Sequence, residues 1–367
     1  MKLINKKRIN EIVEESFINK YLKDEGVTDV KFNGTFLTLK HNKKGKIVPK
    51  DQPDIEEVRR FIRNIADEQN KQITDTNPIL DTEIGFLRVN SVHPKISPDG
   101  QSFAIRVSRP RLVVPDVKSF TKDNSADLEQ LLKVLMLAEK NSVLCGRTGA
   151  GKTEFQKTLV SYIPDVLSIG LIEDTRDSHI KTLYPKKDIT SWVINKELGI
   201  TAQTLVQASL RNDFDWTILA ETRGVEASDL LDSAKTDHAV TTTLHSKRAV
   251  GIPSRFMAMI RQAPAYARME DVALGKEIVE NFPFGIYLKP EKNDNGETVR
   301  MMKELVEFTG FTQDGPEYRY IYRLMNQYDK KTGEYLVKEE FNPLSERVLD
   351  DLMDAKVFHL LPDFAKQ

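Results

Sequence analysis

Residues 142–153 read Ser142-Val143-Leu144-Cys145-Gly146-Arg147-Thr148-Gly149-Ala150-Gly151-Lys152-Thr153. From Gly146 onward the stretch fits the pattern G-x-x-x-x-G-K-[ST] at every fixed position, directly after a short apolar run and before a helical one. Glycines let such a loop curl until several backbone N–H groups point at phosphate oxygens, and the helix that follows adds a favourable dipole. The stretch therefore predicts a strand, a phosphate-binding loop and a helix, in a chain that binds a nucleoside triphosphate.

Two side chains of the predicted loop have specific roles in such sites. Lys152 is expected to reach the terminal phosphates, and the Thr153 hydroxyl is expected to ligate Mg²⁺. ATP and Mg²⁺ are thus the predicted substrate and metal ion. Residues 146–154, which include Glu154, form the predicted nucleotide-binding segment.

Carboxylates end two further apolar runs downstream of the loop. Glu173 follows Leu171-Ile172, and Glu221 follows the run 216–219. Hydrolysis of a phosphoanhydride needs one carboxylate near the attacking water and another that organises the metal ion. The ends of parallel strands meet at one edge of a sheet, where ligands bind. Acidic residues also end strands for solubility alone, but two such ends within one phosphate-loop domain favour catalytic roles.

Histidine and cysteine carry weaker signals. His245 closes a third apolar run, at residues 241–244. A single histidine at a strand end is more often structural than functional, and the same holds for His238. Cys145 immediately precedes the loop, where burial and chemical inertness are the expected state.

Composition limits the classes of protein to which the chain can belong. The 367 residues include 54 Lys+Arg and 55 Asp+Glu, a net charge of -1, which argues against nucleic-acid binding driven by overall charge. With 40% hydrophobic and 30% charged residues, the composition is that of a folded soluble protein. A single cysteine excludes an internal disulfide framework and a cysteine-rich zinc site. Since no apolar run reaches the ~18–20 residues that span a bilayer, we expect a cytoplasmic protein.

The pattern of elements divides the chain. Mixed helical and strand patterns over residues 1–108 predict an α+β amino-terminal domain, and the proline-containing stretch 109–125 predicts a linker. In residues 126–290, helices alternate with short apolar strands, which predicts an α/β domain with a parallel sheet covered on both faces. Turn-rich strands and a helix in residues 291–367 predict a carboxy-terminal appendage.

These segments together resemble the type II/type IV secretion, pilus-assembly and conjugation ATPases, a family of traffic ATPases. Its four boxes occur in order: the phosphate loop, an Asp box at 172–175, a Walker B-like box at 210–224 and a His box at 236–245. Residues 88–92 and 102–106 look like the arginine motifs of the family's first domain, and 304–310 is similar to the tight-adherence branch. A four-cysteine zinc element found in some pilus-extension members is absent, which favours the conjugation and tight-adherence branch.

The resemblance implies a role for each matching residue. The domain at 126–290 would be RecA-like; Glu173 would polarise the attacking water, Glu221 would hold Mg²⁺, and His245 would sense the γ-phosphate. In this family the first domain closes over the nucleotide, so Arg88 and Arg106 would offset charge on the phosphates. Further arginine candidates are Arg109 and Arg223.

The sequence also departs from the family pattern. Glu154 stands where a second threonine is usual, which places a carboxylate close to the phosphates and is expected to weaken nucleotide affinity. Ala220 replaces the usual glycine before Glu221, and Asp237 replaces a glycine before the first histidine of the His box.

The resulting functional prediction is an ATP-hydrolysing, homo-hexameric motor for a secretion, pilus-assembly or conjugative transfer apparatus. It would work at the cytoplasmic face of the inner membrane, bound to inner-membrane components of that apparatus, with no sequence-specific nucleic-acid binding. A nucleic-acid-dependent motor of the helicase or packaging type is the alternative, because the same core serves both classes. A non-catalytic nucleotide switch is a second alternative, which the intact carboxylates disfavour.

Overall fold

The computed structural model describes residues 11–112, 116–122, 125–293 and 295–366. The predicted linker's residues 113–115, 123 and 124, and residues 1–10 of the predicted amino-terminal domain, lie outside the described residues. The chain divides into two compact units, one made of residues 1–110 and 292–299 and the other of residues 111–291 and 300–367.

The first unit is an antiparallel sheet with a helix on one face. Its strand order is β3-β2-β1-β6-β5-β4, in which every strand is antiparallel to its neighbour. An Asp54–Glu57 capping box starts the helix α3, whose apolar stripe packs on the sheet. The elements of this unit are α2 (Asn19–Leu22), β1 (Val27–Phe32), β2 (Leu37–His41), β3 (Gly45–Ile47), α3 (Ile55–Glu68), β4 (Ile79–Ile84), β5 (Leu87–Val92) and β6 (Ser102–Val107).

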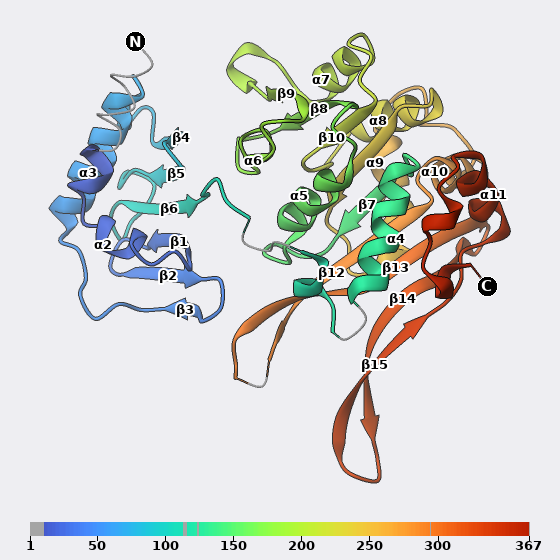
Figure 1. The fold of residues 1–367 in the computed structure, drawn as a ribbon. Coiled ribbons are helices and arrows are strands. Elements are labelled where there is room, and N and C mark those ends of the chain that lie inside the picture. The colour runs from blue at the N-terminus through green and yellow to red at the C-terminus, as the bar shows by residue number, and fades with distance from the viewer. Residues whose placement is uncertain (1–10, 113–115, 123–124, 294, 367) are drawn as a thin grey trace. The chain divides into compact units, whose positions relative to one another are not determined.

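The second unit is built on a nine-stranded sheet of order β15-β14-β13-β12-β7-β11-β10-β8-β9 (Figure 1). From β12 to β9 every neighbouring pair is parallel. These parallel strands are β7 (Ser142–Cys145), β8 (Ser168–Glu173), β9 (Asp188–Val193), β10 (Trp216–Leu219), β11 (Ala239–Leu244) and β12 (Phe284–Lys292). The helices are α4 (Ser125–Leu137), α5 (Lys152–Tyr162), α6 (Ile180–Leu183), α7 (Ala202–Ser209), α8 (Glu226–Lys235), α9 (Ile252–Ile260), α10 (Asp271–Asn281) and α11 (Glu346–Asp354).

Two hydrophobic cores cover the two faces of the parallel strands. Along β7 the side chains alternate: Leu144 lies in one core, while Val143 and Cys145 lie in the other. Helices α4 and α5 supply the first core, and α8, α9 and α10 supply the second. Strands whose two faces are both buried appear in the sequence as continuous apolar runs, which is why the pattern identified β7, β8, β10 and β11. The pattern missed β12 and also β9, which is only partly buried. The predicted α/β fold class with a parallel sheet is confirmed.

Residues 298–341 add three strands to the same sheet. They are β13 (Thr298–Thr312), β14 (Gly315–Asp329) and β15 (Glu334–Phe341), and β14 is antiparallel to both of its neighbours. Helix α11 packs Val348 and Leu352 into the core that contains α4. Residues 300–366, most of the predicted appendage, thus share the sheet and a core with residues 126–290. The ends of β14 and β15 extend away from the helices as a hairpin (Figure 1).

No helix within the described ranges is both long enough and apolar enough to cross a bilayer.

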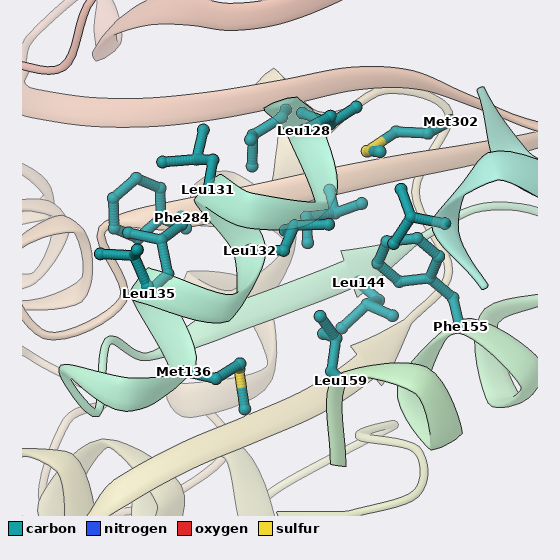
Figure 2. Close-up of a cluster of buried hydrophobic side chains, with 14 of the residues drawn as sticks. Leu128, Leu131, Leu132, Leu135, Met136, Leu144, Phe155, Leu159, Phe284 and Met302 are labelled. Atoms are coloured by element: carbon teal, nitrogen blue, oxygen red, sulfur yellow. The ribbon is translucent and has the colours of Figure 1, made fainter. Parts of the chain in front are cut away.

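The core beneath α5 fixes the helix that follows the predicted phosphate loop. Phe155 is fully buried and meets the ring of Phe120 edge-on, with 4.9 Å between ring centroids. Four leucines of α4 belong to the same buried cluster as Leu144 and Leu159 (Figure 2): Leu128, Leu131, Leu132 and Leu135. The start of α5 is therefore held against the end of β7 by apolar packing, independent of any ligand.

We expect Leu132→Ala to destabilise the second unit by about 2–5 kcal/mol, because it removes buried methyl groups and leaves a cavity. Leu137→Ala on the same helix, where the side chain is 38% exposed, is the matched control and is expected to change stability by no more than about 0.5 kcal/mol. Both tryptophans, Trp192 and Trp216, belong to the second unit, so tryptophan fluorescence during urea unfolding reports on that unit alone. Equal unfolding midpoints for the two variants would contradict the core described here.

Candidate active site

The predicted phosphate loop connects β7 to α5 through three glycines with positive φ. Gly146, Gly149 and Gly151 have φ of 148°, 80° and 93°, values that side-chain-bearing residues rarely adopt. A Cβ on Gly146 would also lie 2.4 Å from the carbonyl oxygen of Leu288 on β12. The glycines of the pattern are thus required here by backbone conformation and by close packing against the neighbouring strand.

Four adjacent strands of the sheet bring the predicted residues to one edge. In the order β7-β11-β10-β8, the loop follows β7, His245 follows β11, Glu221 lies two residues after β10, and Glu173 ends β8. Because these strands are parallel, their carboxyl ends lie along the same edge. Pairing continues past β10, where the Ala220 N–H donates to the Ile172 carbonyl at 2.9 Å.

Lys152 and His245 both contact the loop's first residue. Lys152 Nζ donates to the Gly146 carbonyl oxygen at 2.9 Å and lies 3.5 Å from His245 Nδ1. His245 Nδ1 in turn lies 3.0 Å from the same carbonyl oxygen. The residue that closes β11 is therefore in contact with the loop that follows β7, next to the cation predicted to bind the terminal phosphates.

Glu221 continues this polar cluster. Its Oε1 lies 3.1 Å from His245 Nε2, and its Oε2 accepts a hydrogen bond from Arg223 at 2.9 Å. Arg223 also pairs with Asp174 at 2.6 Å. Burial opposes ionisation of Glu221, but Arg223, His245 and Lys152 outweigh it and hold the pKa of this carboxyl below its ordinary value. Glu221 is therefore a carboxylate at neutral pH.

Glu173 lies in a different environment at the end of β8. Its side chain is only 3% exposed, and its Oε1 accepts a hydrogen bond from the Ser178 backbone N–H at 3.0 Å. Burial raises the pKa of this carboxyl, an effect that the bonds from Ser178 only partly offset. A desolvated carboxylate is a better hydrogen-bond acceptor and base than one in water, which suits activation of a water molecule.

The carboxylate of Glu154 is turned toward its own helix. Its Oε1 pairs with Lys157 Nζ at 2.8 Å, and Lys157 is 2% exposed and also donates to the Arg111 carbonyl at 3.3 Å. This pair neutralises the charge that the sequence placed beside the phosphates. Glu154 and Lys157 are three residues apart on a helix, and this spacing could have indicated the ion pair from the sequence.

The arginine candidates of the amino-terminal motifs belong to the first unit. Arg88 on β5 and Arg106 on β6 are directly opposite in the antiparallel register. Alternation along both strands places them on the face opposite α3, and Arg88 Nε lies 4.0 Å from Asp81 Oδ1. Arg109 instead donates hydrogen bonds to the backbone carbonyls of Leu22 and Val27, at 2.6 and 3.1 Å. Its guanidinium therefore stabilises the backbone of the first unit.

Residues 7–279 match the family model described as Type II/IV secretion system protein. The chain belongs to this family. The match confirms the resemblance found in the sequence, and the chain is an ATPase of the secretion, pilus-assembly and conjugation class with a RecA-like domain.

Individual relatives agree with the family match. An uncharacterized protein of Bacillus anthracis is 27% identical over 98% of this chain and 80% of its own length. Protein VirB11 of Rhizobium radiobacter is 31% identical over 41% of this chain, and a putative conjugal transfer protein of Mycobacterium tuberculosis is 25% identical over 55% of it. The chain spans only 44% and 60% of these two relatives.

Solved structures share the fold. The ATPase DotB of Legionella pneumophila has a TM-score of 0.61 at 15% identity, over 80% of each chain. The pilus retraction motor PilT with bound ADP has a TM-score of 0.59 at 19% identity, over 81% of this chain and 83% of PilT.

Glu173→Gln is expected to stabilise the protein at neutral pH. In the folded state the pKa of Glu173 lies above its ordinary value of 4.5, so the native protein binds this proton more tightly than the unfolded chain does. Wild-type stability therefore falls as pH rises from about 4.5 through the folded-state pKa, and the glutamine variant lacks this loss.

Urea unfolding midpoints at pH 4 and pH 7.5 test this. The advantage of Glu173→Gln over the wild type should be small at pH 4 and larger at pH 7.5. Glu280→Gln, which removes one carboxylate at an exposed position of α10, is the matched control. A variant less stable than the wild type at pH 7.5 would contradict the burial cost assigned to Glu173.

Proposed function

We propose that this ATPase hydrolyses ATP at the carboxyl edge of its parallel sheet, with residues 146–154 as the phosphate-binding segment. The observation that carries the proposal is the alignment of the loop, His245, Glu221 and Glu173 on four neighbouring parallel strands. Backbone N–H groups of residues 147–153 and the start of α5 would bind the phosphates. Lys152 would exchange the Gly146 carbonyl for phosphate oxygens, since both contacts need the same donor.

The residues present also fit a magnesium ion. In the described part of the chain, no group of three or more His, Cys, Asp and Glu side chains could hold a metal by itself. Mg²⁺ in nucleotide sites typically uses one or two protein oxygens together with substrate phosphates and water. Thr153, which follows Lys152, and Glu221, whose pKa is lowered, would be these ligands. When bound, the ion would neutralise charge on the β- and γ-phosphates.

Glu173 would act on the attacking water. Its carboxylate would accept a hydrogen bond from the water and orient its oxygen toward the γ-phosphorus. The new phosphorus–oxygen bond would form as the bond to the β,γ-bridging oxygen breaks, which gives ADP and inorganic phosphate. His245, within 3.5 Å of Lys152 and 3.1 Å of Glu221, would register whether a γ-phosphate is present because Lys152 must move to contact it.

Arg88 and Arg106 would contribute from the first unit. Arg88 and Arg106 are cross-strand neighbours on one sheet face, so a single phosphate group could contact both guanidinium groups. We propose that the first unit closes over ATP and that these arginines offset charge developing on the phosphates.

The motor would act as a homo-hexamer bound to inner-membrane components of a secretion, pilus or conjugation machine, at the cytoplasmic face of the membrane. The family match and the relatives named VirB11 and conjugal transfer protein support this class of machine.

Two substitutions test the site. Lys152→Ala should abolish tight nucleotide binding, because the loop loses its mobile cation. Glu173→Gln should bind ATP near normally while hydrolysis falls about 10²–10⁴-fold. Titration with a fluorescent ATP analogue and steady-state phosphate release measure the two effects, with the exposed Lys186→Ala as control. Unchanged affinity in Lys152→Ala, or turnover of Glu173→Gln within a few-fold of the wild type, would remove that residue from the site.

Arg106→Ala tests the contribution of the first unit. Loss of one charge-assisted contact in the transition state costs about 2–4 kcal/mol, so turnover should fall about 30–1000-fold. Affinity for ADP, which lacks the γ-phosphate, should change far less. Arg60→Ala on the exposed side of α3 is the control, and light scattering checks that assembly is unchanged. Wild-type turnover in Arg106→Ala would mean that the second unit alone forms the active site.

A further inference from the structure

Arg300 on β13 packs against the last glycine of the phosphate loop. A Cβ built on Gly151 would lie 2.7 Å from Arg300 Cδ and 3.1 Å from Phe120 Cε1. The stem of Arg300 and the ring of Phe120 therefore pack against Gly151, at the point where α5 begins. Gly151 can occupy this position only because it has no side chain.

The guanidinium of Arg300 lacks a partner within the described part of the chain. It makes no hydrogen bond or ion pair there, although the residue is only partly exposed. Burial lowers the pKa of this guanidinium, and the negative charge of Glu154 counteracts the effect. A partly buried guanidinium with no acceptor in the described protein must bind either water or an anion that is supplied from elsewhere.

The carboxylate of Glu154 does not fully neutralise the charge of Arg300. This carboxylate is already paired with the buried ammonium of Lys157 at 2.8 Å. The negative charge of Glu154 is therefore shared between Lys157 and Arg300, beside the first turn of α5. Lys152 is directed toward Gly146 and His245. Lys152 and Arg300 thus contact different parts of the loop, near Gly146 and near Gly151 respectively.

We propose that Arg300 is a nucleotide-binding residue whose guanidinium donates hydrogen bonds to the α- and β-phosphate oxygens, the part common to ATP and ADP. The inference rests on the proposed function of the loop. Lys152 and His245 serve the end where the γ-phosphate would lie, whereas Arg300 is beside Gly151 and Glu154, where the loop becomes helix. A guanidinium presents a planar fork of N–H donors that matches two phosphate oxygens.

Arg300→Gln is the direct test, with Arg319→Gln on the neighbouring strand β14 as matched control because the Arg319 side chain is exposed. In the full chain, loss of a charge-assisted contact should weaken binding of both ADP and ATP by about 10-fold or more. The effect should shrink at high salt. This differs from Arg106→Ala, which is expected to spare ADP. Arg300→Lys keeps the charge without the fork and should show an intermediate loss, a measurement available even if the glutamine variant folds poorly.

A double substitution separates direct binding from a structural role. If Arg300 only balanced Glu154, then Glu154→Gln would remove the need for it, and Glu154→Gln/Arg300→Gln would bind ADP as tightly as Glu154→Gln alone. That result would overturn the inference, as would equal ADP affinity in Arg300→Gln and the wild type. We expect the double variant to remain at least about 10-fold weaker than Glu154→Gln.

Wild-type binding distinguishes this inference from the function on which it rests. If the wild type binds ADP, Lys152→Ala does not, and Arg300→Gln binds normally, only the role of Arg300 fails. If the wild type itself binds neither ADP nor ATP, the proposed function fails.

Discussion

Parallel pairing of β7, β11, β10 and β8 is the constraint on which the site depends. The carboxyl end of each strand leads to one of the residues proposed to act on ATP, and parallel strands all end at the same edge. An antiparallel strand among them would send its end to the opposite edge and break the cluster. The antiparallel strands β13, β14 and β15 lie beyond β12, outside the four strands that carry the site.

Basic and acidic side chains are in contact along this edge. Lys152, His245, Glu221, Arg223 and Asp174 form a continuous series of contacts, most of them between 2.6 and 3.1 Å. Such a network satisfies each group within the protein and holds the side chains near the positions in which they would act. Binding of a triphosphate then requires Lys152 to exchange one oxygen acceptor for others, rather than to be desolvated anew. The site is thus electrostatically preorganised.

The two strand-end carboxylates have opposite electrostatic environments. Cationic neighbours lower the pKa of Glu221, and burial raises the pKa of Glu173. A carboxylate kept charged by cations suits a metal ligand, while a desolvated carboxylate suits an acceptor of a water proton. The burial of the Glu173 carboxylate costs stability, which is consistent with the conflict between stability and activity expected if Glu173 has the proposed catalytic role.

The sequence by itself determined the loop and the strand ends. The conformation of residues 146–151 depends on three glycines within six residues, and buried strands appear as apolar runs. Local pattern therefore sufficed to predict both the loop and the positions of Glu173 and Glu221. Tertiary structure alone decided that Arg300 packs on Gly151, that Arg88 faces Arg106, and that β13 to β15 continue the sheet. These contacts join segments far apart in the chain, through strand pairing and side-chain packing that no local periodicity encodes.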